Sequence, residues 1–303
     1  MSGPARGALW MTLAACSFAV MSALVRYLSQ SISPLEVLFF RNFFGLIFLM
    51  PTLIQAGWAN LRTNNFKRHG LRSLFGLTSM YTWFIGLAYL PLADATSLTF
   101  IAPIIASIFA IVFLGEQAGW RRWSAIFVAF GGALIILRPG FQEVPPTAWL
   151  MLCGTFATAG AVIMVKVLSR TEASSAIIGY MGIYMTPASL IPALFVWQTP
   201  ALELWPWIVL MGAAATLGQW GMTNAYASTD ATIVLPFDYV RLPMVALIGY
   251  AAFAETPDAM TCLGGLVIAA ATIYIARRES KLAKSRMIHA SKLAAETPKV
   301  ENG

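Results

Sequence analysis

Ten long apolar segments occupy most of this sequence and limit what it can fold into. A bilayer core about 30 Å thick is crossed by about 20 helical residues, and backbone polar groups inside it must find partners within the helix. Short links that contain proline or glycine separate most of the segments. We therefore predict an all-α membrane protein with ten transmembrane helices. The predicted helices cover residues 8–28, 35–55, 70–89, 93–114, 120–137, 147–168, 175–197, 204–227, 232–254 and 258–276.

The composition supports this prediction and argues against a soluble domain. Hydrophobic residues make up 58% of the 303 residues and charged residues only 11%, whereas soluble domains carry about 25% charged residues. The net charge of +7 raises the alternative of nucleic-acid binding. The basic residues, however, cluster in the short links between apolar segments, where charges set the orientation of a membrane protein. The expected partner is the lipid bilayer, and no nucleic acid is expected.

The distribution of Lys and Arg predicts the orientation. Fifteen of the 20 basic residues fall on one side of the predicted membrane, and Arg138 alone falls on the other side. Because cytosolic links are enriched in Lys and Arg, we expect a multi-pass protein of the cell inner membrane with both termini cytosolic. The residues assigned to the cytosol are Arg6, Arg62, Lys67, Arg68, Arg72, Arg121, Arg122, Arg170 and those from Arg277 onward.

The two halves of the chain repeat one pattern. We predict a first five-helix unit over residues 1–140, a second over 141–278, and a polar cytosolic tail over 279–303. With five helices in each half, the second must enter the membrane in the opposite orientation, and such an inverted repeat lets a central site open to either side. The matching positions are Trp10 with Trp149, VRYLSQ at 25–30 with VKVLSR at 165–170, Asp-Ala-Thr at 94–96 and 230–232, and Glu116 with Glu255.

With these features the chain resembles the drug/metabolite transporter superfamily, in its EamA-like ten-helix branch. The resemblance rests on the segments Pro34–Asn42, Gly86–Glu116 and Phe130–Pro139, and on Glu255 with the glycine pair 264–265 in the second half. The second half departs from the family's pattern in lacking a glycine before Glu255. It implies an inverted pair of five-helix units around a central cavity, and a metabolite such as an amino acid, vitamin or nucleoside as solute. The stretch Pro236–Glu255 resembles the subgroup that contains riboflavin and S-adenosylmethionine carriers.

Charged residues in the ninth segment are the first candidates for a solute site. A charge at a helix centre costs about 2.5–3.5 kcal/mol on the insertion scale, so it usually faces a partner or a hydrated cavity. Asp238 and Arg241 are three residues apart, on one helix face next to Tyr239. Pro236 and Pro243 flank them and can open a kink. The alternative is a mutually neutralising pair that only joins two helices.

The second, third and eighth segments supply the other candidates. Arg41 either faces a cavity or joins helices, and Glu36 is either a site residue or a first-turn acid stabilised by the helix dipole. Flat rings beside amides suit a planar, polar solute, although each ring could instead face lipid or the core. These aromatic and amide candidates are Tyr81, Trp83, Gln219, Trp220 and Asn224.

Further charged and small residues have structural interpretations. We expect Asp94 and Asp230 to cap helix starts, and Arg26 and Lys166 to extend toward the headgroups. Glu116 and Glu255 are expected to anchor helix ends. The pairs at 131–132 and 264–265 are glycines, which allow helices to approach closely.

The residues needed for membrane enzymology are not found together. The only histidines are His69, expected in a cytosolic link, and His289 in the tail, so neither is placed to activate a buried cysteine. No metal-binding spacing or cofactor motif occurs. We therefore predict a secondary transporter of a small organic solute, with no metal and no cofactor. A membrane scaffold and an integral membrane enzyme are the alternatives, and a homodimer is left open.

Overall fold

The computed structural model describes residues 3–56, 63–114, 120–137, 143–168, 171–172, 174–228, 237–256, 258–274 and 277. Every regular element within these ranges is a helix, which confirms the all-α prediction. The first are α1 (Gly3–Leu28), α2 (Pro34–Ala56), α3 (Phe66–Tyr89), α4 (Leu92–Thr99), α5 (Ala102–Leu114) and α6 (Trp120–Leu137). Then follow α7 (Pro146–Leu168), α8 (Ser174–Phe195), the 3-10 turn η2 (Leu202–Leu204), α9 (Trp205–Ser228), α11 (Arg241–Phe253) and a last helix, Ala259–Tyr274. Glu116, Asp230, Pro236 and the side chain of Lys166 lie outside the description.

Several helices are suited to a bilayer by length and apolarity. Among the residues that the structure describes, five helices can cross a membrane on these criteria, and α6, α11 and the last helix are shorter apolar helices. Helices α3 and α9 have 24 residues each but carry polar side chains such as Arg72 and Gln219. The chain is therefore a multi-pass membrane protein, although length and apolarity alone identify five of the ten predicted spans. These five are Ala5–Leu28, Pro34–Pro51, Leu92–Phe113, Pro146–Val165 and Ala176–Phe195.

The distribution of polar and apolar side chains fits a lipid environment. Large apolar residues lie on the outside, with Phe195 85% and Leu202 86% exposed. Charged and amide residues lie inside, among them Glu36 and Asn42, which are 0% and 5% exposed. A water-soluble protein rarely buries ionisable groups while it exposes large apolar surfaces. This arrangement is stable when the surrounding solvent is hydrocarbon.

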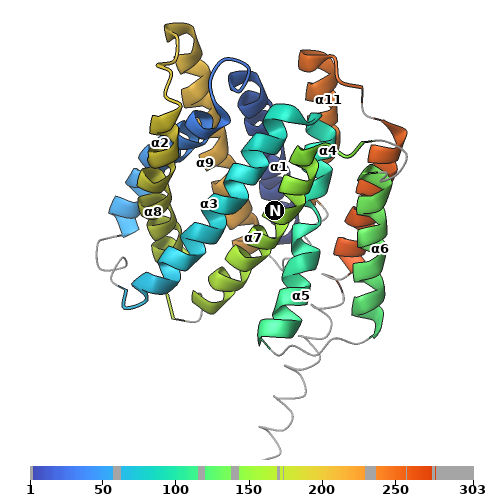
Figure 1. Cartoon of the computed structure of the whole chain (residues 1–303). Helices are drawn as coiled ribbons and strands as arrows, with labels where there is room; N and C mark the ends of the chain where they lie inside the picture. The colour runs from blue at the N-terminus through green and yellow to red at the C-terminus, as the bar shows by residue number, and fades with distance from the viewer. Residues whose placement is uncertain are drawn as a thin grey trace, which may run out of the picture.

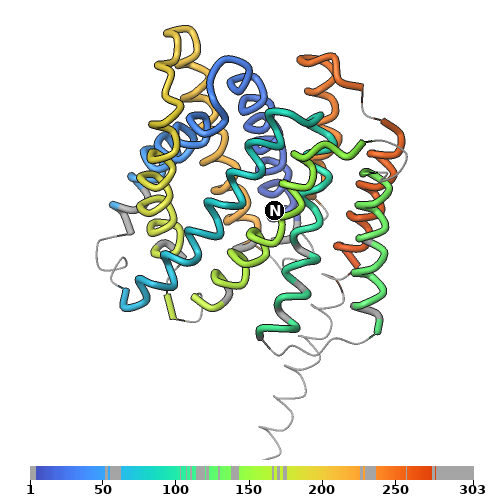
Figure 2. Tube along the Cα trace, viewed as in Figure 1, coloured from blue at the N-terminus to red at the C-terminus, as the bar shows by residue number. Residues whose placement is uncertain are grey.

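Helix packing repeats between the halves of the chain. Helix α1 packs mainly on α9, and α7, the first helix of the second half, packs mainly on α3. In the same way α1 meets α11 while α7 meets α5, and α2 meets α8. In Figure 1, α2, α8 and α9 gather on one side and α6 stands with the last helix on the other; Figure 2 shows the same course of the chain. The sequence repeat thus has a counterpart in the packing.

Helix α6 and the last helix approach each other at two glycines. A Cβ on Gly132 would lie 2.9 Å from the carbonyl oxygen of Gly264, and one on Gly264 would also meet the carbonyl oxygen of Gly132. Backbones this close leave no room for side chains. The predicted close contact is confirmed for these two glycines, whereas a Cβ on Gly131 would meet nothing within 4 Å.

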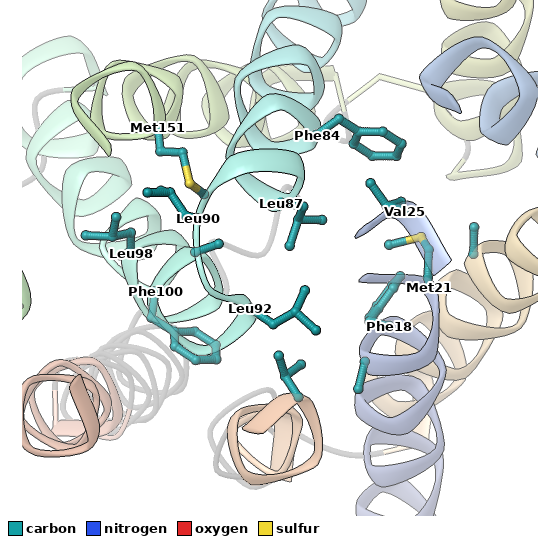
Figure 3. Packing of buried hydrophobic residues seen from close by; sticks show 14 of the residues in the cluster. Phe18, Met21, Val25, Phe84, Leu87, Leu90, Leu92, Leu98, Phe100 and Met151 are labelled. Atoms are coloured by element: carbon teal, nitrogen blue, oxygen red, sulfur yellow. The ribbon is translucent and has the colours of Figure 1, made fainter. Parts of the chain in front are cut away.

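Apolar side chains from α1, α3, α4 and α7 pack together in one buried cluster (Figure 3). The side chains of Phe84, Leu87 and Leu92 are fully buried. Burial of each such side chain stabilises a fold by about 1.5–3 kcal/mol in water, whereas in lipid close packing replaces that driving force. The labelled residues are Phe18, Met21, Val25, Phe84, Leu87, Leu90, Leu92, Leu98, Phe100 and Met151.

The predicted span 93–114 is found at Leu92–Phe113, but its helix is interrupted at Phe100–Ile101 between α4 and α5. Proline at position 103 has no N–H to donate to the Thr99 carbonyl, and proline disfavours the preceding helical turn. The ninth segment shows the same feature: a turn at Tyr239–Val240 precedes α11, four residues before Pro243. The two interrupted helices occupy equivalent places in the two halves.

Asp94 does not cap α4 as predicted. The N-cap residue is Pro91, and Asp94 lies inside the first turn. Its Oδ1 accepts a hydrogen bond of 2.7 Å from the Thr261 hydroxyl of the last helix. An acid in the first turn still complements the helix dipole, and the hydrogen bond to Thr261 joins the two halves of the chain.

Candidate functional site

A cavity of about 600 Å³ lies between α2, α8 and α9. Its volume falls in the range of about 300–1,000 Å³ that is usual for small-molecule sites. Since α2 belongs to the first half of the chain and α8 and α9 to the second, both halves form its wall. Most of the lining is apolar, with a few polar side chains. The lining residues are Arg41, Asn42, Gly45, Leu46, Phe48, Leu49, Ile178, Met181, Gly182, Met185, Ala213, Ala215, Thr216, Leu217, Gln219, Trp220 and Thr223.

The wall holds a hydrogen-bonded polar group that the sequence prediction found only in part. Arg41 Nη1 donates to Asn42 Oδ1 at 3.1 Å, and Asn42 Nδ2 donates to Ser189 Oγ at 3.2 Å. Thr186 Oγ1 donates to the Asn42 carbonyl, and the Tyr81 hydroxyl donates to the Ser189 carbonyl, each at 3.4 Å. These contacts fix the Arg41 and Asn42 side chains against α8, so the polar end of the cavity is preorganised.

Besides Tyr81, three of the predicted aromatic and amide candidates lie at or beside this cavity. Gln219 and Trp220 line it, and Asn224 donates to the Trp220 carbonyl at 2.8 Å. The Trp220 ring meets Trp10 edge to face at 5.1 Å. Trp83 does not line the cavity: its ring packs on Phe84 and against the core.

Asp238, Tyr239 and Arg241 lie together but apart from the cavity lining. Asp238 Oδ2 and Arg241 Nη2 are 3.6 Å apart. The Tyr239 ring lies 4.5 Å from Phe100, and the Arg241 guanidinium lies 5.0 Å from the same ring. Phe100 and Tyr239 are the residues at which the fourth and ninth segments are interrupted, so these interruptions touch each other. The cluster therefore joins the two halves, and it forms a second candidate site.

Glu36 does not line the cavity. Its side chain is fully buried, with Oε2 accepting from the Ser33 N–H at 3.1 Å and Oε1 from the Gln198 N–H at 2.7 Å. Both carboxylate oxygens therefore satisfy backbone donors at the start of α2 and in the link after α8. This geometry matches the first-turn interpretation of Glu36.

The prediction that Arg26 extends toward the lipid headgroups is wrong, because its side chain points into the protein. Arg26 Nη2 binds Glu255 Oε1 at 3.0 Å, while Glu255 Oε2 accepts from the Leu92 N–H at 2.8 Å. Arg26 Nη1 also donates to the carbonyls of Leu87, Ala88 and Leu90. The predicted anchoring role of Glu255 fits this contact, which joins α1, the α3–α4 link and the end of α11.

Two residues assigned to the cytosolic link lie in α3, His69 buried and Arg72 partly buried. His69 is 1% exposed, and its ring lies 4.5 Å from Tyr180. The Nε and Nη1 atoms of Arg72 are buried. Arg72 therefore belongs to the helix and not to the cytosolic link. Its position inside the predicted span 70–89 already indicated this.

Glu172 connects the link between α7 and α8 with the link that precedes α3. Its Oε1 accepts from Asn65 Nδ2 at 2.7 Å and from Thr63 Oγ1 at 2.6 Å. These hydrogen bonds, Asn65 first, lower the pKa of the Glu172 carboxyl below its ordinary value, and nearby His69 adds to the effect. In the described residues no three His, Cys, Asp or Glu side chains gather as a metal site.

Comparison with known proteins identifies relatives over almost the whole chain. The EamA-like transporter family matches residues 5–138 and again 145–277. A riboflavin transporter of Vibrio cholerae serotype O1 is 32% identical over 289 residues, which are 93% of this chain and 96% of the relative. An S-adenosylmethionine uptake transporter of Rickettsia bellii is 30% identical over 272 residues, 90% and 94% of the two chains.

Two more comparisons widen the range. A pseudopaline exporter of Pseudomonas aeruginosa is 30% identical over 276 residues, covering 89% of this chain and 96% of the exporter. A solved structure described only as the crystal structure of a protein has a TM-score of 0.62 at 16% identity, over 90% of this chain and 98% of that one. The last similarity concerns the fold alone.

Proposed function

This chain belongs to the EamA-like transporter family, and we propose that it is a secondary transporter whose solute binds in the cavity between α2, α8 and α9. Like the named relatives, which are transporters, it is a small-metabolite transporter and not an enzyme. The finer proposal is a carrier with ten spans, built from inverted units over 1–140 and 141–278 and a cytosolic tail over 279–303, in the inner membrane.

The cavity is the observation that carries this proposal. It holds about 600 Å³, is mostly apolar and has a few fixed polar groups, including Arg41 and Asn42. Such a lining buries an organic solute and orients it by a few hydrogen bonds. Because both halves form the wall, a movement of one half against the other changes access to the solute. The Asp238–Arg241 cluster, where the interrupted helices meet, is the proposed place of that movement.

The relatives supply the first solutes to test. Their names refer to riboflavin, S-adenosylmethionine and pseudopaline, which are organic molecules with polar groups. We propose riboflavin and S-adenosylmethionine as the first probes, with amino acids next. A thermal-shift screen extends the search, since a ligand at 100 times its Kd adds about 2.7 kcal/mol of stability.

Filling the cavity tests the proposal. Gly45 lines it, and a Cβ there would meet only Thr216 Oγ1, at 3.9 Å. We expect Gly45→Leu to leave the protein folded and to abolish uptake of the identified solute into proteoliposomes under an imposed ion gradient. Gly131→Leu on α6, where a Cβ meets nothing within 4 Å, is the matched control and should retain uptake. Full uptake by Gly45→Leu and by Thr216→Trp would remove this cavity as the solute site.

Reporter fusions test the orientation. Fusions after residues 66, 120 and 285 should read cytosolic, and a fusion after residue 143 should read external, because cytosolic links carry the basic residues. A cytosolic reading at 143 contradicts both the ten-span arrangement and the inverted repeat.

A further inference from the structure

Two arginines beside the cavity carry charges that no carboxylate of the described residues neutralises. Arg41 on α2 is 8% exposed, and Arg72 on α3 has two buried guanidinium nitrogens. Helices α2 and α3 pack against each other. The Arg72 guanidinium is near enough to repel that of Arg41. The fold therefore holds two like charges together.

The hydrogen-bonding groups of these arginines are incompletely used. Arg41 Nη1 donates to Asn42, but Arg41 Nε has no acceptor. Neither Nε nor Nη1 of Arg72 has one. Across the described ranges, no carboxylate forms an ion pair with either side chain. Glu172 accepts hydrogen bonds from Thr63 and Asn65, and its Oε2 lies 3.9 Å from His69 Nε2. Buried charges without partners are costly, so these groups call for an acceptor.

The geometry places both arginines at one end of the cavity. Arg41 lines it directly. Arg72 Nη1 and Met185 Sδ each lie 3.5 Å from the position of a Cβ built on Gly76, and Met185 is a lining residue. An acceptor in this part of the cavity is therefore within reach of α2 and α3 together.

We propose that Arg41 and Arg72 bind an oxyanion of the transported solute, a carboxylate or a phosphate ester. Guanidinium groups match the planar geometry of such oxygens and form charge-assisted hydrogen bonds with them. The apolar lining, which includes Leu46 on α2 and Trp220 on α9, accepts the uncharged body of the solute. The substrate class is thus an organic acid with an apolar or aromatic body. This inference rests on the proposed function, because it assumes that the solute enters this cavity.

Benzoate and benzamide are matched probes, equal in shape and different in charge. We expect benzoate to raise the melting temperature of the purified full-length protein at constant ionic strength, and benzamide to leave it unchanged. Arg41→Gln and Arg72→Gln should each weaken benzoate binding by about ten- to a hundredfold, since a hydrogen bond to a charged group contributes about 1.5–3 kcal/mol. Arg68→Gln removes the same charge at an exposed site on α3 and should bind benzoate as wild type does.

Two further measurements keep the test decisive if a variant does not fold. Without benzoate, Arg72→Gln should melt no lower than wild type, because the repulsion on Arg41 is relieved. In the unaltered protein, phenylglyoxal labels accessible arginines, and benzoate should slow labelling at Arg41 and Arg72 but not at Arg68. Equal effects of benzoate and benzamide, or equal protection of all three arginines, would overturn the proposal.

A phospholipid headgroup presents the same oxyanion chemistry. If Arg72→Gln loses a copurifying anionic phospholipid while wild type does not bind benzoate, the anion belongs to a lipid and the proposal is wrong. Benzoate binding without uptake of any solute contradicts only the transport proposal. Uptake that persists unchanged in Arg41→Gln and Arg72→Gln contradicts only the oxyanion site.

Discussion

The contact between Arg26 and Glu255 yields the most quantitative prediction. Glu255 accepts two hydrogen bonds, of 3.0 Å from Arg26 and 2.8 Å from the Leu92 N–H, and the two side chains of the ion pair are 20% and 17% exposed. Each hydrogen bond to a charged group contributes about 1.5–3 kcal/mol. Glu255→Gln keeps one acceptor oxygen and turns an N–H₂ group toward a donor. We therefore expect the free energy of unfolding to fall by about 2–4 kcal/mol, which is at or below the cost of about 3–5 kcal/mol for breaking a fully buried ion pair.

Thermal unfolding of purified Glu255→Gln in detergent measures this loss. The expected decrease in Tm is about 5–10 °C. Glu203→Gln is the matched control, because Glu203 is exposed in η2. Neutralising it should change the Tm little. The double variant Arg26→Gln with Glu255→Gln should be more stable than the sum of the single losses predicts, because neither charge is left alone. The reasoning is refuted if Glu255→Gln and Glu203→Gln have the same Tm.

Three more predictions follow from other contacts. Because the folded pKa of Glu172 is lowered, its stabilisation is complete above the unfolded pKa of about 4.3 and is lost on further acidification; the Tm difference between wild type and Glu172→Gln should shrink below that pH. Gly132→Ala places a Cβ against the Gly264 carbonyl and should cost about 1–3 kcal/mol, whereas Gly131→Ala should not destabilise the protein in the same melts. Asp238→Asn with Arg241→Gln should retain stability but lose solute uptake; restored uptake in this double variant would make the pair purely structural.

The sequence alone determined the regular structure, because each helix in a bilayer must satisfy its own backbone. The helices of the described ranges overlap the predicted apolar segments, and the boundaries of α2, α7 and α8 differ from prediction by one or two residues. The repeat was also readable, since its matching tryptophans and glutamates are not residues that apolar composition supplies. The sequence also gave Arg41 as a site candidate, because a charge within a span is costly. It gave Gln219 and Trp220, because rings beside amides suit a planar, polar solute.

Tertiary structure decided which residues meet. Arg26 and Glu255 are 229 positions apart, and nothing local favours that partner over the headgroups. Arg72 looked like a link charge until the packing of α2 on α3 set it beside Arg41. Phe100 and Tyr239 come together only because the two halves fold against each other. Periodicity and composition act within one helix, whereas the cavity, its charges and its contacts arise between helices, where the sequence carries no spacing to read.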